Sequence, residues 1–67
     1  MEEQNTMQQM TLEEYRRKVH ECLNKRYPNI PDYVQKVVDA YYEEIEELYN
    51  ENWKVEICAG AIFSGLL

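Results

Sequence analysis

The sequence contains few of the residues that small domains use to fix their shape covalently or through a metal. Its 67 residues include two cysteines, two glycines, two prolines and one histidine. Disulfide-held scaffolds usually carry four or more cysteines, so we expect no disulfide framework. We expect Cys22 and Cys58 to be small buried apolar residues, with a bridge between them as the less favoured alternative. His20 and Cys22 are two positions apart on a predicted helix and do not face each other, so we expect no catalytic pair.

Motifs that carry chemistry are also absent. The chain has no phosphate-binding glycine loop, no serine elbow and no CxxC pair. Its glutamates have no histidine at metal-ligand spacing and no glycine-containing ligand loop. A chain of this size is also expected to have little room for a substrate pocket of about 300 Å3 or more. We therefore predict no enzyme activity, no cofactor and no metal site.

Positive charge is scarce, with seven Lys and Arg against 13 Asp and Glu and a net charge of −6. Direct binding to nucleic acid or to an anionic membrane needs clustered cations, so this balance argues against both. The sequence has no run of about 20 apolar residues that could span a bilayer. Its acidic start, Met-Glu-Glu-Gln-Asn, does not resemble a signal peptide. We predict a cytoplasmic protein whose partner, if it has one, is basic.

Patterned sequence begins only after a polar, glutamine-rich segment, so we predict a disordered leader at 1–10 and one helical domain at 11–67. Thr11 and Glu14 have the spacing of a capping box. The residues that follow repeat at helical spacing to about residue 26. The outer face of this first helix, 11–26, carries five of the seven cations.

The central segment, 30–50, is predicted to be one helix antiparallel to the first. Its apolar residues alternate at steps of four and three, which places them on one face. They are Val34, Val38, Tyr41, Ile45 and Leu48. Pro28 and Pro31 end the preceding helix, since each excludes its predecessor from the α region. We expect Tyr41 and Tyr15 to lie in the core.

The C-terminal segment, 53–66, fits a helix better than a strand, because its alternation lasts only six residues and no other strand is predicted. Asn50 or Asn52 is expected to cap this helix. The predicted fold is therefore all-α, a small three-helix domain. Ala61 and Gly65 are small residues four apart, a spacing that permits close helix approach. The third helix is expected to complete the core, to mediate self-association into a homodimer, or to do both.

The far face of the central helix is strongly acidic. We predict that it binds a partner through carboxylates and bordering tyrosines. These candidates are Asp39, Tyr42, Glu43, Glu46, Glu47, Tyr49 and Glu51. The glutamates lie in the C-terminal half of the predicted helix, where the dipole disfavours anions by about 0.3–1 kcal/mol each. A solvated face that only aids solubility is the alternative explanation.

In size, acidity and tyrosine content the chain resembles the short phage-encoded anti-CRISPR proteins, several of which imitate nucleic acid. That resemblance covers general character and implies a non-enzymatic inhibitor that docks on the basic nucleic-acid-binding surface of a partner protein, such as a nuclease. It transfers no site residue. The alternative hypothesis is a structural or adaptor subunit that dimerises through the apolar C-terminal helix.

Overall fold

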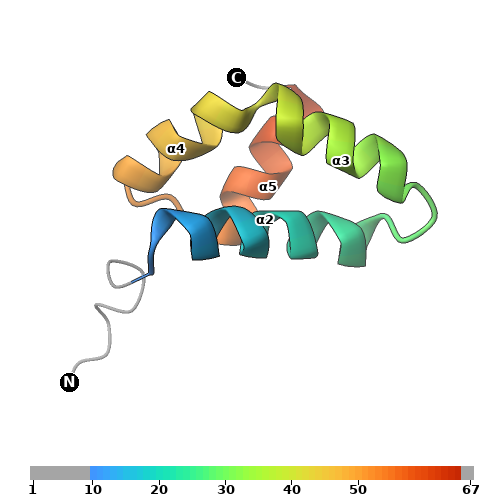
Figure 1. Ribbon diagram of the computed structural model, residues 1–67, viewed down its shortest axis with the longest axis horizontal. Helices are drawn as coiled ribbons and strands as arrows, with labels where there is room; N and C mark the ends of the chain where they lie inside the picture. Colours follow the sequence, from blue (N-terminus) through green and yellow to red (C-terminus); the bar gives the residue numbers. More distant parts are fainter. Residues whose placement is uncertain (1–9, 66–67) are drawn as a thin grey trace.

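The computed structural model describes residues 10–65, which form an all-α fold of four helices (Figure 1). In chain order these are α2 (Leu12–Arg26), α3 (Pro31–Ala40), α4 (Tyr42–Asn50) and α5 (Val55–Ser64). The predicted fold class is confirmed, but the prediction of three helices is wrong by one. The predicted leader, apart from Met10, lies outside the described residues. None of the described helices is both long and apolar enough to cross a membrane.

The start of α2 follows directly from its sequence. The Thr11 hydroxyl accepts a 3.1 Å hydrogen bond from the amide of Glu14, and the Thr11 amide donates at 3.3 Å to the Glu14 carboxylate. This is the predicted capping box, which satisfies two amides that the first turn leaves without helical partners. Tyr15, Val19 and Leu23 follow at helical spacing and are all buried.

The central segment bends at Tyr41 and is not the single helix predicted. Tyr41 has φ −104° and ψ 29°, which ends α3 and starts α4. Sharp helix bends are usually found at proline or glycine. Neither residue is present here, since Tyr41 is flanked by Ala40 and Tyr42. A straight 20-residue helix would measure about 30 Å, whereas the 15-residue α2 opposite it measures about 22 Å. The bend therefore lets both halves of the segment reach the core.

Packing on both sides of Tyr41 supports this explanation. Figure 1 shows α3 and α4 as two arms of an arch over α2 and α5, and each arm contacts both of these helices. Val34 on α3 and Ile45 on α4 are both fully buried. Tyr41 itself is only partly buried and lies at the edge of the core. The prediction of a core position is therefore confirmed for Tyr15 and not for Tyr41.

The prediction that the C-terminal segment is helical is confirmed. The helix is shorter than the predicted 53–66 and covers Val55–Ser64. Lys54 precedes α5 as its N-cap, without a side-chain hydrogen bond, so the predicted cap by Asn50 or Asn52 is wrong. Asn52 instead has a positive φ of 67° in the α4–α5 turn, a conformation that asparagine tolerates better than most residues. Gly65 ends α5 with φ 75°, a common glycine role at helix C-termini.

The core lies where α5 packs against α2 beneath the arch. Tyr15 and Leu23 of α2 pack in one cluster with Cys58 and Ile62 of α5. Cys58 is buried, whereas Cys22 is only half-buried, and both thiols are free. The alternative of a bridge between them is therefore not seen.

Three aromatic side chains pack together at the end of the core near the α2–α3 connection. The Tyr27 ring stacks on Phe63 at a centroid distance of 4.1 Å. The Tyr33 ring meets the same Phe63 edge-on at 5.6 Å. Tyr27 and Tyr33 thus pack across the connection, and α5 supplies the ring between them.

Candidate functional site

The carboxylates predicted to bind a partner lie on the outer face of the arch. We call Asp39, Glu43, Glu46 and Glu47 the acidic surface; all four residues are exposed. Asp39 lies near the end of α3, and the three glutamates lie on α4. The bend at Tyr41 therefore separates Asp39 from the glutamates, so the acidic surface does not follow one straight helix.

The bend also changes the electrostatic argument made from the sequence. Glu43 and Glu44 lie in the first turn of α4, where the helix dipole stabilises anions. The prediction that the dipole disfavours all these glutamates is therefore wrong for these two. Glu46 and Glu47 lie beyond that turn, and α4 has no basic residue in its last turn to offset them. Glu47, which has no ion-pair partner among residues 10–65, still indicates selection on something other than helix stability.

Arg16 of α2 meets the arch at the beginning of α4. Its guanidinium donates a 2.6 Å hydrogen bond to the carbonyl oxygen of Tyr42 and lies over the Tyr42 ring, 3.5 Å from the centroid. A second nitrogen lies 3.8 Å from a carboxylate oxygen of Glu46. The antiparallel arrangement predicted from the sequence makes the basic α2 and the acidic segment neighbours, but the sequence does not single out Arg16. This arginine neutralises part of the acidic surface.

In the described part of the chain, the rest of the acidic surface has no counter-charge within 4 Å. Across residues 10–65 the contact between Arg16 and Glu46 is the only ion pair within 4 Å. Asp39 accepts a 3.0 Å hydrogen bond from the Gln35 amide, which is neutral. Glu43 and Glu47 lie four residues apart on α4, about 6 Å along the helix axis. Their charges face solvent and are available to a partner.

Two other predicted binding residues take part in the fold. The Tyr49 hydroxyl donates a 2.5 Å hydrogen bond to the carbonyl oxygen of Met10, and its ring lies 5.2 Å from that of Tyr15. Glu51 accepts a 3.2 Å hydrogen bond from the Trp53 indole nitrogen. Tyr42 is 56 % exposed, with Arg16 against its ring. Of the two predicted tyrosines, only Tyr42 is exposed beside the acidic surface.

The residues predicted for self-association are placed differently from each other. Ala61 is 7 % exposed within the monomer. Gly65 is exposed but follows the end of α5 as its C-cap, so it is not on the helix. Together they do not form an open helical stripe. Ile57, at 57 % exposure, is the large apolar side chain that α5 leaves open.

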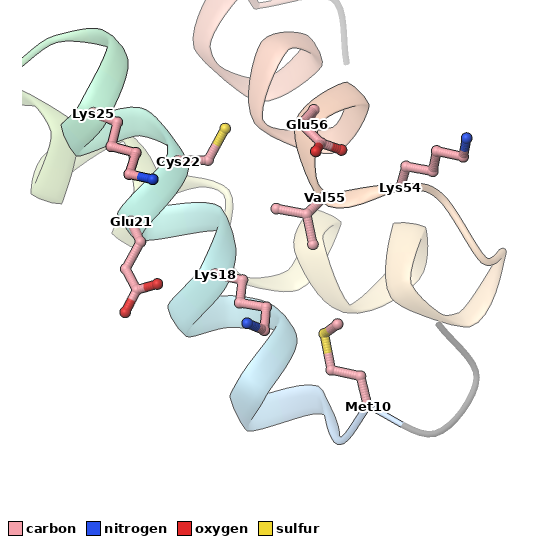
Figure 2. A pocket seen from close by; sticks show the side chains of 8 residues that line it. All are labelled: Met10, Lys18, Glu21, Cys22, Lys25, Lys54, Val55 and Glu56. Atoms are coloured by element: carbon pink, nitrogen blue, oxygen red, sulfur yellow. The ribbon is translucent and has the colours of Figure 1, made fainter. Parts of the chain in front are cut away.

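An open pocket of about 630 Å3 lies between α2 and the beginning of α5, shown in Figure 2. Its lining residues are Met10, Lys18, Glu21, Cys22, Lys25, Lys54, Val55 and Glu56. Because this pocket is open, it does not decide the expectation that so small a chain has little room for a pocket that buries a substrate. No sequence pattern signals this pocket, since its two sides are about 30 residues apart and are brought together only by packing of α5 on α2.

Neither the pocket nor the acidic surface forms a metal site. Within the described part of the chain, no three His, Cys, Asp or Glu side chains are grouped so that they could hold a metal ion. Glu43, Glu46 and Glu47 are exposed along one short helix, whereas calcium or magnesium sites need oxygens that converge.

The chain was compared with known proteins by sequence and by structure. No protein-family model matches it, and neither a curated protein nor a solved structure matches it.

Proposed function

We propose that this protein is a non-enzymatic inhibitor or modulator that binds a basic surface of a partner protein through its acidic surface. The observation that carries the proposal is the pair Glu43 and Glu47, two exposed carboxylates on one helix that have no counter-charge within 4 Å among residues 10–65. A net charge of −6 adds long-range attraction to a cationic partner. Charge complementarity of this kind increases the association rate and excludes other acidic proteins.

The partner class that fits is a protein whose basic groove holds nucleic acid. Such a groove is lined by Lys and Arg that neutralise phosphates, and carboxylates on a rigid helix can occupy the same positions. The resemblance to anti-CRISPR proteins in size, acidity and tyrosine content supports a nuclease as the target. Tyr42, exposed next to the carboxylates, supplies an aromatic ring of the kind found at binding hot spots.

Affinity capture from a bacterial lysate, with mass spectrometry and a salt titration, tests this proposal. The variant Glu43→Gln/Glu47→Gln removes two charges from the acidic surface and leaves the contact between Arg16 and Glu46 in place. The matched control Glu21→Gln/Glu56→Gln removes two exposed charges from α2 and α5 instead. We expect the first variant to lose a salt-sensitive nucleic-acid-binding protein that the control retains. Equal capture by both variants would reject the proposal.

Dimerisation through α5 is the alternative, and the exposure of Ile57 is the feature that favours it. Sedimentation velocity at micromolar concentration separates the two functions. A dimer that Ile57→Ser dissociates would support self-association. The proposed inhibitor is expected to sediment as a monomer.

A further inference from the structure

The bend at Tyr41 interrupts the hydrogen-bond ladder of the segment 31–50. The Tyr41 amide donates a 3.0 Å hydrogen bond to the carbonyl oxygen of Val37, and the Ile45 amide donates one of 2.9 Å to the carbonyl oxygen of Tyr41. Across residues 10–65, no hydrogen bond joins the amides of 42–44 to the carbonyl groups four residues before them. A continuous helix would make these three bonds. The bend therefore lacks helical bonds that the segment could form.

The sequence at the bend is compatible with a continuous helix. Residues 32–50 contain neither proline nor glycine, the residues at which helices usually kink. The apolar repeat from Val34 to Leu48 also continues through Tyr41 without a change of face. The cause of the bend is therefore the packing of α3 and α4 on α2 and α5 (Figure 1), and not the local sequence. Without that packing, one straight helix over 31–50 is the conformation that the local sequence favours.

A single copy of the chain cannot straighten this segment and keep its core. Val34 on α3 and Ile45 on α4 are both 0 % exposed, and the bend brings both of them to the same core. In a straight helix of about 30 Å, the arm that carries Ile45 and Leu48 would leave the core and expose these side chains to water, which is unfavourable. A second copy of the chain has an identical site for this arm. An identical chain is therefore the partner that can cover it.

We propose that two copies of the protein exchange α4 and α5, with the segment 31–50 straight in each copy. α2 and α3 of one copy then pack on α4 and α5 of the other, so the core is built twice from the same contacts. The ring contact of Tyr15 with Tyr49, and the hydrogen bond from Tyr15 to the Trp53 carbonyl group, form between the copies. Each copy gains the three helical bonds that the bend lacks. Exchange of identical elements is a low-cost route to dimers.

The bent monomer is the form expected at low concentration, because association costs translational and rotational freedom. The exchanged dimer forms when chains fold close to each other. It then persists after dilution, because its copies separate only when the core opens. This inference goes beyond the proposed function and does not depend on it, since it rests on the backbone at Tyr41 and on the core, and not on the charge of the acidic surface.

Refolding from urea at micromolar and at millimolar concentration, followed after dilution by sedimentation velocity, tests the exchange. We expect the wild type to give monomer after dilute refolding and a dimer fraction that increases with the refolding concentration. Glu43→Pro should reduce this fraction by at least about tenfold, because proline cannot donate to the Asp39 carbonyl group and is excluded from helix interiors. The bent monomer tolerates this proline, since Glu43 lies in the first turn of α4. Glu43→Ala is the matched control, because it removes the same carboxylate and keeps the amide, and it should dimerise as the wild type does.

The exchanged dimer has a signature that a surface dimer lacks. In dimers of differently labelled copies, isotope-filtered nuclear Overhauser contacts between the rings of Tyr15 and Tyr49 should connect one copy with the other. In a dimer formed through the exposed Ile57, these contacts stay within each copy. The Glu43 amide should also exchange with deuterium more slowly in the dimer than in the monomer, since it donates there to the Asp39 carbonyl group.

The inference is wrong if refolding at millimolar concentration yields only monomer, or if Glu43→Pro dimerises as well as Glu43→Ala does. Contacts between Tyr15 and Tyr49 that stay within single copies of the dimer would also overturn it. Should Glu43→Pro lose its helical circular dichroism, the filtered contacts in the wild-type dimer decide the question alone.

Discussion

The hydroxyl group of Tyr15 donates a 2.7 Å hydrogen bond to the carbonyl oxygen of Trp53. The tyrosine lies near the beginning of α2, and the carbonyl group lies in the turn that leads into α5. The Tyr15 ring is only 1 % exposed, so the hydroxyl needs a partner inside the protein. This bond joins two segments that are distant in sequence and fixes the turn that precedes α5.

Replacing Tyr15 with phenylalanine removes this bond and keeps the ring. We expect the free energy of unfolding at pH 7 to fall by about 1–2 kcal/mol, because the Trp53 carbonyl group loses its partner. Urea denaturation followed by circular dichroism measures the change. Tyr33→Phe is the control, since the Tyr33 side chain is 53 % exposed, and its effect should stay within about 0.5 kcal/mol. Equal effects of the two substitutions would contradict this role of Tyr15.

The stability of the protein is expected to decrease at alkaline pH. Burial, and then the neighbouring Cys58 thiol, raise the pKa of Tyr15 well above its ordinary 10.0. Burial likewise raises the pKa of Cys58 above its ordinary 9.0, although a hydrogen bond with Tyr15 opposes this. The native state therefore keeps protons that the unfolded chain loses. The stabilisation linked to these two protons is complete below pH 9. It is lost as the pH rises above 9.0 and 10.0, the ordinary pKa values at which the two groups ionise in the unfolded chain.

Urea denaturation from pH 7 to 11 measures this decrease. In Tyr15→Phe, the decline above pH 10 should be shallower by up to about 1.4 kcal/mol per pH unit, since one titrating group is gone. A wild-type stability that does not change between pH 9 and 11 would contradict the expected linkage.

The two thiols should differ in reactivity. Cys22 is half-buried at the pocket, whereas Cys58 is 0 % exposed and has a raised pKa, so it forms less thiolate. We expect iodoacetamide to alkylate Cys22 first and Cys58 at least about a hundredfold more slowly, because Cys58 reacts only when the protein opens. Mass spectrometry of digested samples gives both rates. In 8 M urea the two rates should converge, and similar rates in the native protein would refute the packing described for Cys58.

The two glycines are expected to respond to alanine in opposite directions. At Gly60, inside α5, an added Cβ atom would lie 3.5 Å from the nearest Arg26 nitrogen, which is ordinary contact. Gly60→Ala should therefore stabilise the protein by up to about 1 kcal/mol through helix propensity. Gly65 has φ 75°, so Gly65→Ala should destabilise it by about 1 kcal/mol. Thermal denaturation of both variants measures the difference.

Changes of the same sign at the two glycines would show that α5 does not end as described. Because Gly65 has a positive φ, replacing it with a larger residue such as leucine is a poor test of self-association. A larger residue there disturbs the helix end whether or not a dimer forms.

The elements that the sequence predicted well are those with local signals. The capping box of Thr11 and Glu14 lies within four residues, and the apolar repeat of α2 follows it without interruption. The exposure of Glu43 and Glu47 was likewise predictable, because helical periodicity alone separates them from the buried Ile45 and Leu48.

The features that were missed depend on packing between distant segments. No residue next to Tyr41 signals a bend, since the apolar repeat runs through it without proline or glycine. The contact of Arg16 with Tyr42 joins positions 26 apart, and several arginines and lysines on α2 were equal candidates for it. The pocket needs α5 to lie against α2 before its two sides meet.

The most direct test of the proposed inhibition is displacement of nucleic acid from the captured partner, followed by the anisotropy of a labelled oligonucleotide. Wild-type protein and the control Glu21→Gln/Glu56→Gln are expected to release the oligonucleotide. Glu43→Lys/Glu47→Lys, with unchanged helical circular dichroism, is expected to release none. Equal release by this variant, or a stable ternary complex that keeps the oligonucleotide bound, would contradict binding through the acidic surface.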